Sequence, residues 1–328
     1  LFLQLTGRND WSSALPESNN SYFYPSLSVS AILSDMLKIS SPWLNFWKLR
    51  TSYAQVGNDT DPYQTNPYYD YSVLPGAVNL PETLPNTDLK PEITSSFELG
   101  TEFKLFKDRL GVDFTWYASE SKNQILRSPL SVSTGYSAQV MNAGKITNKG
   151  WEALLRITPV KRRLVWDVSI TGSANRSKVV ELADGVESYV MASAQGATVE
   201  ARIGGRMGDI YGVGLARNEE GKVIYQGGVP VFTTNTMKVG NYNPDLIAGI
   251  RNNFQYKDWS LGFLFDGRLG GDIYSFTYVT GTEAGSLENT LPGREDGIIG
   301  DGVVRNADGT YSPNTERVAA YTYYRGYY

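Results

Sequence analysis

The side chains that could carry out chemistry in this sequence are carboxylates and hydroxyls, because its 328 residues include no histidine and no cysteine. A Ser-His-Asp triad, a thiolate nucleophile and a metal site built on cysteine or histidine are therefore excluded. A pair of carboxylates could hydrolyse a glycosidic bond without histidine, but the spacing of Asp and Glu singles out no pair. We therefore predict no catalytic residue, no cofactor and no enzymatic activity.

Three aspartates in a glycine-rich stretch, Asp296, Asp301 and Asp308, offer the oxygen ligands that Ca²⁺ prefers. Their spacing does not match the EF-hand loop. Acidic residues among glycines are also typical of surface turns. We predict that these aspartates hold no metal.

Four tyrosines, Tyr63, Tyr68, Tyr69 and Tyr71, lie close together in a proline-rich loop that we expect over residues 57–90. Aromatic rings at the mouth of a binding site can stack on sugar rings or hold a peptide. The same rings could instead pack the loop against its neighbours, because a loop of this kind needs apolar contacts to be ordered. Both roles remain open, and the four tyrosines are the candidate substrate-binding residues.

The elements that must position these residues are β-strands, as residues 95–119 indicate most clearly. Apolar and polar side chains alternate there on both sides of a charged turn at residues 107–109. Strict alternation predicts strands with one apolar and one polar face, here joined as a hairpin. Each run is long enough to cross a bilayer, which needs about 9–11 tilted strand residues.

Similar runs recur along the chain, and we expect about ten long strands. Besides the two runs of residues 95–119, these strands cover residues 1–8, 22–33, 43–56, 150–160, 164–171, 245–256 and 259–266. Short turns near 34–42, 107–109, 161–163 and 257–258 alternate with long loops at 57–93, 127–147, 183–243 and beyond 277. This asymmetry is typical of outer-membrane barrels, which have short periplasmic turns and long extracellular loops.

Four tryptophans support a membrane barrel, since Trp43, Trp47, Trp166 and Trp259 each follow a short turn. We predict that they form one aromatic girdle, with apolar rings in lipid and N–H groups among the headgroups. The alternative is that they lie in the core of a soluble β-sandwich, whose strands also alternate. No apolar run approaches the roughly 20 residues of a transmembrane helix.

Charged side chains fall on the predicted polar face and would line the barrel's lumen. They are Glu98, Glu102, Lys104, Asp113, Glu152, Arg156, Asp167, Arg251, Asp266 and Arg268. They could line a solute path, or pair in networks of mixed sign with each other, with water and with a plug. The whole chain carries 30 basic and 34 acidic residues, a net charge of −4, so we expect no nucleic-acid partner.

Four sequence blocks resemble, in order, the SusC/RagA family of TonB-dependent outer-membrane transporters of Bacteroidota. They are RNDWSSALPESNNSYFYPSLSVSAILS (8–34), KLRTSYAQVGND (48–59), LKPEITSSFELGTEFKLFKDRLGVDFTWYASESKNQIL (89–126) and MNAGKITNKGWEALLRITP (141–159). The resemblance continues weakly through ARIGGRMGDIYGVG (201–214) and GDGVVRNADGTYSPNT (300–315). It covers nearly the whole chain.

This resemblance implies an all-β fold, in which the chain forms a segment of a large, plugged, antiparallel transmembrane β-barrel in the outer membrane. It also implies import of oligosaccharides or peptides, a SusD-like surface lipoprotein as partner, and energy supplied through the TonB complex. Contact with membrane lipid follows from the barrel. The alternative function is a surface or secreted carbohydrate-binding β protein, which would be extracted without detergent.

Comparison with the family pattern predicts that residues 1–328 are the C-terminal part of the barrel. By this comparison we expect the plug domain, the TonB-box segment and the final strands of the family pattern to be absent from residues 1–328. About ten strands cannot close a barrel of the 22-stranded class. We therefore expect the residues that couple to TonB to lie outside this sequence.

Overall fold

The computed structural model describes residues 1–326 and consists mainly of antiparallel β-strands. The chain forms two compact units. The first comprises Leu1–Tyr189, Arg202–Met207 and Pro244–Gly270. The second comprises Val190–Ala201, Gly208–Asn243 and the described residues from Gly271 onward.

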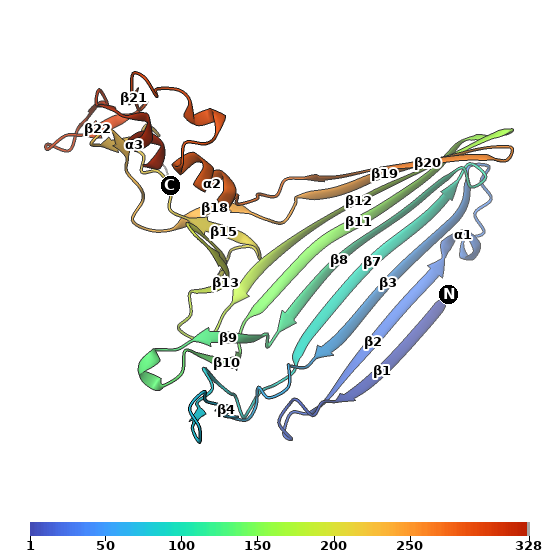
Figure 1. Ribbon diagram of the computed structural model, residues 1–328. Helices are drawn as coiled ribbons and strands as arrows, with labels where there is room; N and C mark the ends of the chain where they lie inside the picture. Colours follow the sequence, from blue (N-terminus) through green and yellow to red (C-terminus); the bar gives the residue numbers. More distant parts are fainter. Residues whose placement is uncertain (327–328) are drawn as a thin grey trace. The chain divides into compact units, whose positions relative to one another are not determined.

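A nine-stranded antiparallel sheet dominates the first unit, with neighbouring strands in the order β1-β2-β3-β7-β8-β11-β12-β19-β20 (Figure 1). The strands are β1 (Phe2–Trp11), β2 (Ser21–Ile32), β3 (Leu44–Asn58), β7 (Glu92–Leu105), β8 (Leu110–Lys122), β11 (Lys145–Lys161), β12 (Leu164–Glu181), β19 (Leu246–Tyr256) and β20 (Trp259–Leu269). Every predicted long strand is present, and the sheet has nine such strands rather than about ten.

The register of the sheet confirms that its two faces differ. In the β7–β8 hairpin, Phe103 pairs with Val112 on one face, while Glu102 pairs with Asp113 on the other. Side chains on the apolar face remain exposed to an unusual degree, with Leu261 at 62% and Phe265 at 68%. A face of this kind needs an apolar environment that the described residues do not supply.

Glycines on the polar face allow long side chains to lie flat across neighbouring strands. A Cβ atom on Gly100 would come within 2.5 Å of the Arg50 guanidinium, and one on Gly150 would come within 2.4 Å of the Tyr117 hydroxyl. Such close approach requires a residue without a side chain.

Short turns and long loops lie at opposite ends of the sheet, as predicted (Figure 1). The turn end carries α1 (Leu33–Met36). The loop end carries β4 (Asp70–Tyr71), β5 (Val78–Asn79), β6 (Thr83–Leu84), β9 (Ile125–Pro129), η1 (Val132–Thr134) and β10 (Ala138–Asn142). No helix among residues 1–326 is both long and apolar enough to cross a membrane.

The second unit contains short strands and helices around a small core. Its strands are β13 (Ser188–Ala194), β14 (Ala197–Arg202), β15 (Asp209–Gly212), β16 (Ile224–Gln226), β17 (Val229–Pro230), β18 (Met237–Asn241), β21 (Ile298–Ile299), β22 (Val303–Arg305), β23 (Tyr311–Pro313) and β24 (Arg317–Val318), of which β13 and β14 begin or end in the first unit. Its helices are α2 (Phe276–Glu283), η2 (Glu288–Thr290) and α3 (Ala320–Arg325).

Short strands in the glycine-rich region were predicted, but the helices were not. The expectation that the chain is loop-like beyond residue 277 was therefore wrong in part, because α2, α3 and four two- or three-residue strands form there. Elements this short give no measurable sequence periodicity.

Candidate functional site

The proline-rich loop between β3 and β7 is held in place by its own apolar anchor. Leu89 is fully buried and forms a cluster with Leu15 and Val140, against which Tyr22 and Ile125 pack. Backbone pairing fixes the middle of the loop, since β6 runs parallel to β10 and Thr83 is the partner of Ala138. The loop is therefore a folded structure at the long-loop end of the sheet.

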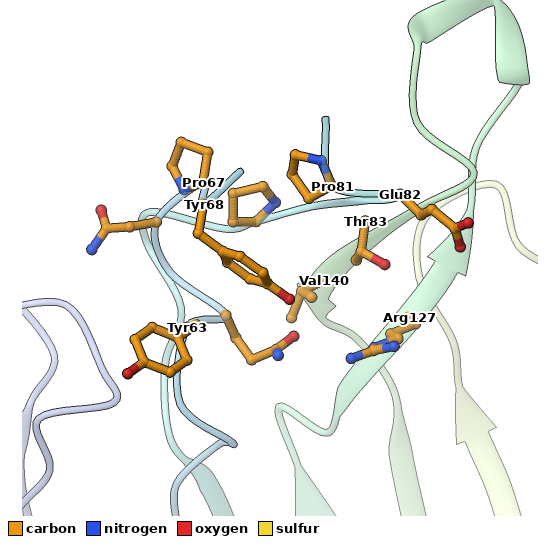
Figure 2. A pocket seen from close by; sticks show the side chains of 11 residues that line it. Tyr63, Pro67, Tyr68, Pro81, Glu82, Thr83, Arg127 and Val140 are labelled. Atoms are coloured by element: carbon orange, nitrogen blue, oxygen red, sulfur yellow. The ribbon is translucent and has the colours of Figure 1, made fainter. Parts of the chain in front are cut away.

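A cavity of about 240 Å³ lies beneath this loop, and Tyr63 and Tyr68 are among the residues that line it (Figure 2). Their ring centroids are 5.9 Å apart and the ring planes are tilted by 60°. Tyr69 and Tyr71 do not line the cavity, and their side chains are 60% and 94% exposed. The structure thus brings together two of the four predicted tyrosines and places the other two on the loop surface.

Arg127 on β9 also lines the cavity, and the sequence analysis did not identify it. Figure 2 shows its side chain and that of Tyr68 directed towards the same space, next to Val140. Arg127 forms no ion pair or side-chain hydrogen bond with any residue in the part of the chain that the structure describes. No sequence pattern marks this arginine, because only the pairing of β9 with β10 brings it beneath the tyrosines.

A second cavity of about 350 Å³ shares Arg127, Gln64 and Val140 with the first and has an acidic lining. Two of its carboxylates are already engaged. Asp59 accepts a hydrogen bond of 2.5 Å from the Ser12 hydroxyl, and Glu92 accepts one of 2.8 Å from the Ile125 amide. Together the two cavities offer ring faces, an unpaired cation and carboxylates, which can bind polar oligomers but form no recognisable catalytic arrangement.

The polar face of the sheet carries all ten charged residues that were predicted to line the lumen, as the strand register shows. Of these ten residues, only Asp113 forms an ion pair among residues 1–326. It accepts two hydrogen bonds from Arg50, at 2.6 and 3.3 Å, and Arg50 also contacts the Thr115 hydroxyl at 2.6 Å. Arg50 is not among the ten predicted residues, so this ion pair does not join two of them, and networks between the ten stay a prediction.

The four tryptophans predicted to form one girdle differ in the surroundings of their indole rings. Trp47 donates its indole N–H to the Thr101 hydroxyl at 3.1 Å, and Trp166 donates to the Asn252 side chain at 3.1 Å. Trp43 and Trp259 are 54% and 80% exposed. Two indoles therefore satisfy their N–H groups within the sheet. That all four tryptophans lie at one level stays a prediction.

No group of three or more acidic, histidine or cysteine residues that could hold a metal occurs among residues 1–326. Asp308 instead stabilises a turn, because its carboxylate accepts hydrogen bonds from the hydroxyl and amide of Thr310 at 2.6 and 2.9 Å. These hydrogen bonds, that of the hydroxyl above all, lower the pKa of Asp308.

Comparison with known proteins identifies relatives of the whole chain. A family model described as a TonB dependent receptor-like β-barrel matches residues 1–325. Two TonB-dependent receptors of Formosa agariphila are each 27% identical to the chain, over 312 and 302 residues. Each alignment covers 83% of this chain and 30% of the relative. The chain thus spans less than a third of the length of these relatives.

Solved structures show the same fold. The RagAB peptide transporter superimposes with a TM-score of 0.69 at 22% identity, covering 80% of this chain and 31% of that one. The RagAB peptide importer in its "closed-closed" state gives a TM-score of 0.70 at 21% identity, with coverage of 82% and 32%. At this identity the likeness concerns the fold.

Proposed function

The chain belongs to the TonB-dependent receptor-like β-barrel family, and from this premise we propose that the whole protein imports oligosaccharides or peptides across the outer membrane with energy supplied through TonB. Family membership confirms the predicted resemblance, places the chain in the outer membrane and agrees with the prediction that it is not an enzyme. It also favours a transporter over the alternative of a secreted carbohydrate-binding protein.

The observation that carries this proposal is the two-faced sheet with its asymmetric ends. One face exposes large apolar side chains such as Phe265, as a lipid-facing barrel wall does. The other face carries charges and glycines, as the wall of an aqueous lumen does. We further propose that a SusD-like lipoprotein acts with the long-loop end, and that residues outside this sequence contact TonB.

The cavity under the β3–β7 loop is our candidate for solute contact at the extracellular mouth. Tyr63 and Tyr68 supply two ring faces that meet at an angle, which suits a sugar ring or an apolar side chain of a peptide. The Arg127 guanidinium has no ion pair or side-chain hydrogen bond in the described chain. It supplies N–H donors for an acceptor on the solute. Tyr69 and Tyr71 serve, in this proposal, as surface residues of the loop.

A paired mutational experiment on the intact protein tests the cavity. Replacing Tyr63 and Tyr68 together by alanine should weaken solute binding about tenfold, because each aromatic contact contributes about 0.5–1.5 kcal/mol. The matched control replaces Tyr69 and Tyr71 by alanine, which removes the same atoms from the same loop but outside the cavity. Solute binding is measured by calorimetry with oligosaccharide and peptide libraries.

Equal losses in the two double variants would show that the loop acts as a whole and would remove the cavity from the proposal. Unchanged binding in both would place solute contact elsewhere on the protein. Import itself is tested separately by deleting TonB in cells that depend on the solute. Growth that persists without TonB would overturn the proposed transport mechanism.

A further inference from the structure

A cluster of cations lies at the long-loop end of the sheet's apolar face, where charge is unexpected. Its members, here called the basic patch, are Lys122 on β8, Lys145 and Lys149 on β11, and Arg176 and Lys178 on β12. The strand register places them on one face, since Lys122 pairs with Lys145 and Lys149 pairs with Arg176. Trp116 and Trp151 pair directly on that same face.

Neighbouring carboxylates neutralise only part of the basic patch. Glu120 forms ion pairs of 2.8 Å with both Lys122 and Lys145, and Asp245 forms one of 2.7 Å with Arg176. Glu181 stands opposite Lys145 in the ladder. Lys149 and Lys178 are exposed and have no ion pair among residues 1–326.

Lys149 lies beside Arg176 without a counter-ion of its own among residues 1–326, whereas Arg176 is paired with Asp245. These two residues are direct cross-strand partners, and like charges in such positions destabilise a sheet. Lys178 follows two residues after Arg176 on the same face and adds a third positive charge. An anion bound between them would relieve this repulsion.

The surroundings of the basic patch indicate what kind of anion it meets. The next outward-facing residues towards the centre of the sheet are Trp116, Trp151 and Ala174, which belong to the lipid-facing surface. Tryptophan is typical of the boundary between hydrocarbon and headgroups in membrane barrels. Cations one step beyond that boundary lie at the depth of the headgroups, where phosphate groups attract lysine and arginine.

We propose that the basic patch binds the phosphate of a lipid headgroup on the long-loop side of the membrane, through Lys149 and Lys178 beside Arg176. The lipid's acyl chains would lie against Trp116 and Trp151. This proposal rests on the position of the patch on a lipid-facing wall. It does not depend on which solute the protein imports.

Three chemically matched probes test the proposal on the intact protein in detergent, with bound lipid counted by native mass spectrometry. Phosphatidic acid has both phosphate and acyl chains, diacylglycerol lacks the phosphate, and glycerol 3-phosphate lacks the chains. We expect phosphatidic acid to bind at least tenfold more tightly than either of the others. Replacing Lys149 and Lys178 together by glutamine should weaken phosphatidic acid binding by on the order of tenfold or more.

The control variant removes the same charge from the opposite face of the sheet, through Lys48→Gln and Lys104→Gln. It should change phosphatidic acid binding less than twofold. The patch variant should assemble at least as well as the native protein, because it removes like-charge repulsion. If it does not assemble, Lys178→Gln alone should still weaken binding several-fold.

Three results would overturn the proposal. Phosphatidic acid that binds no better than diacylglycerol would show that the phosphate is not recognised. Glycerol 3-phosphate that competes as well as phosphatidic acid would make the patch a general anion site. Equal losses in the patch and control variants would show a non-specific effect of net charge, and an acidic protein partner would then become the better candidate for the patch.

Discussion

In the nine-stranded sheet, large apolar side chains such as Phe265 and Trp259 stay 68% and 80% exposed, whereas in the second unit Tyr225 and Asp209 are each only 1% exposed. The sheet is held by long backbone ladders and keeps its apolar side chains on the outside. The second unit has short ladders and buries an aromatic ring on β16 and a carboxylate on β15.

The two units thus differ in where they keep their large apolar side chains. The apolar face of the sheet is stable against lipid, where exposed aromatic and aliphatic side chains carry no penalty. The second unit buries Tyr225 and the carboxylate of Asp209, which accepts a hydrogen bond from Asn241. Substitutions of the same chemical kind should therefore have different effects in the two units.

The largest effect should come from emptying the core of the second unit by Tyr225→Ala. The Tyr225 ring lies so close to Gly300 and Gly302 that a Cβ atom on either would come within 2.6 Å of it. Removal of an aromatic ring from a packed core costs about 3–5 kcal/mol. We expect rapid proteolysis within the second unit, measured by limited proteolysis and mass spectrometry.

The control for this prediction is Tyr311→Ala, because Tyr311 is 40% exposed in the same unit. Its effect should stay within about 0.5 kcal/mol. Similar protease sensitivity in the two variants would show that the second unit lacks the compact core described above, and the contrast with the sheet would be lost.

The next largest effect should come from placing a charge on the apolar face of the sheet by Phe114→Arg, or by Phe103→Arg on the neighbouring strand. A cationic side chain near the bilayer midplane costs about 2–4 kcal/mol in a membrane barrel. Assembly is measured by the heat-dependent gel mobility of the protein in outer membranes. Ser119→Arg on the polar face of the same strand is the control, and it should assemble normally.

Normal assembly of Phe114→Arg would mean that this face does not contact lipid. Failure of Ser119→Arg alone would mean that the two faces are assigned the wrong way round. Either result would remove the main difference between the sheet and the second unit.

The sheet could be predicted from sequence because period-two alternation continues over ten or more residues in most of its strands. The turn at residues 106–109 also follows from its charged sequence, although Phe106, Lys107 and Asp108 all have positive φ there. The second unit gave no comparable signal. Its strands are as short as Ile298–Ile299, and their partners, such as Arg317–Val318, lie far away in the sequence.

The candidate cavity was predictable only in part for the same reason. Tyr63 and Tyr68 attract notice as members of an aromatic cluster, and both line the cavity. Arg127 comes from another segment and reaches the cavity through the pairing of β9 with β10, and of β10 with β6 of the loop. The direction of Tyr69 and Tyr71 is decided by the loop backbone, which carries no repeating pattern.

A smaller effect should follow from removing the cation that accompanies the buried carboxylate of the second unit. Lys238 forms an ion pair with Asp209 at 2.5 Å, and Asn241 donates a hydrogen bond to the same carboxylate at 2.7 Å. Lys238→Ala should destabilise the unit by about 1–3 kcal/mol, because a buried charge loses a partner. Hydrogen exchange of β15 and β18 measures this change.

Lys222→Ala is the matched control, since Lys222 pairs with Glu220 at 3.2 Å while both side chains stay more than half exposed. An exposed pair contributes about 0–1 kcal/mol. If the two alanine variants had equal effects, the ion pair at Asp209 would behave as a surface pair, and burial in this unit would matter less than the comparison with the sheet requires.

The smallest expected effect is a local dependence on pH in the β22–β23 hairpin of the second unit. Hydrogen bonds from the hydroxyl and amide of Thr310 lower the pKa of Asp308 in the folded hairpin. Because the folded pKa lies below the unfolded value, which is about 3.9 for an aspartate, the carboxylate stabilises the hairpin at pH values above the unfolded pKa. That contribution is lost as the pH falls through the folded pKa. Carbon-13 NMR of labelled aspartate carboxyls should show Asp308 titrating below the pKa of an aspartate in an unfolded chain. The Thr310→Val variant removes the hydroxyl and should move the titration of Asp308 upwards, whereas an unchanged midpoint would show that the hydroxyl does not hold the carboxylate.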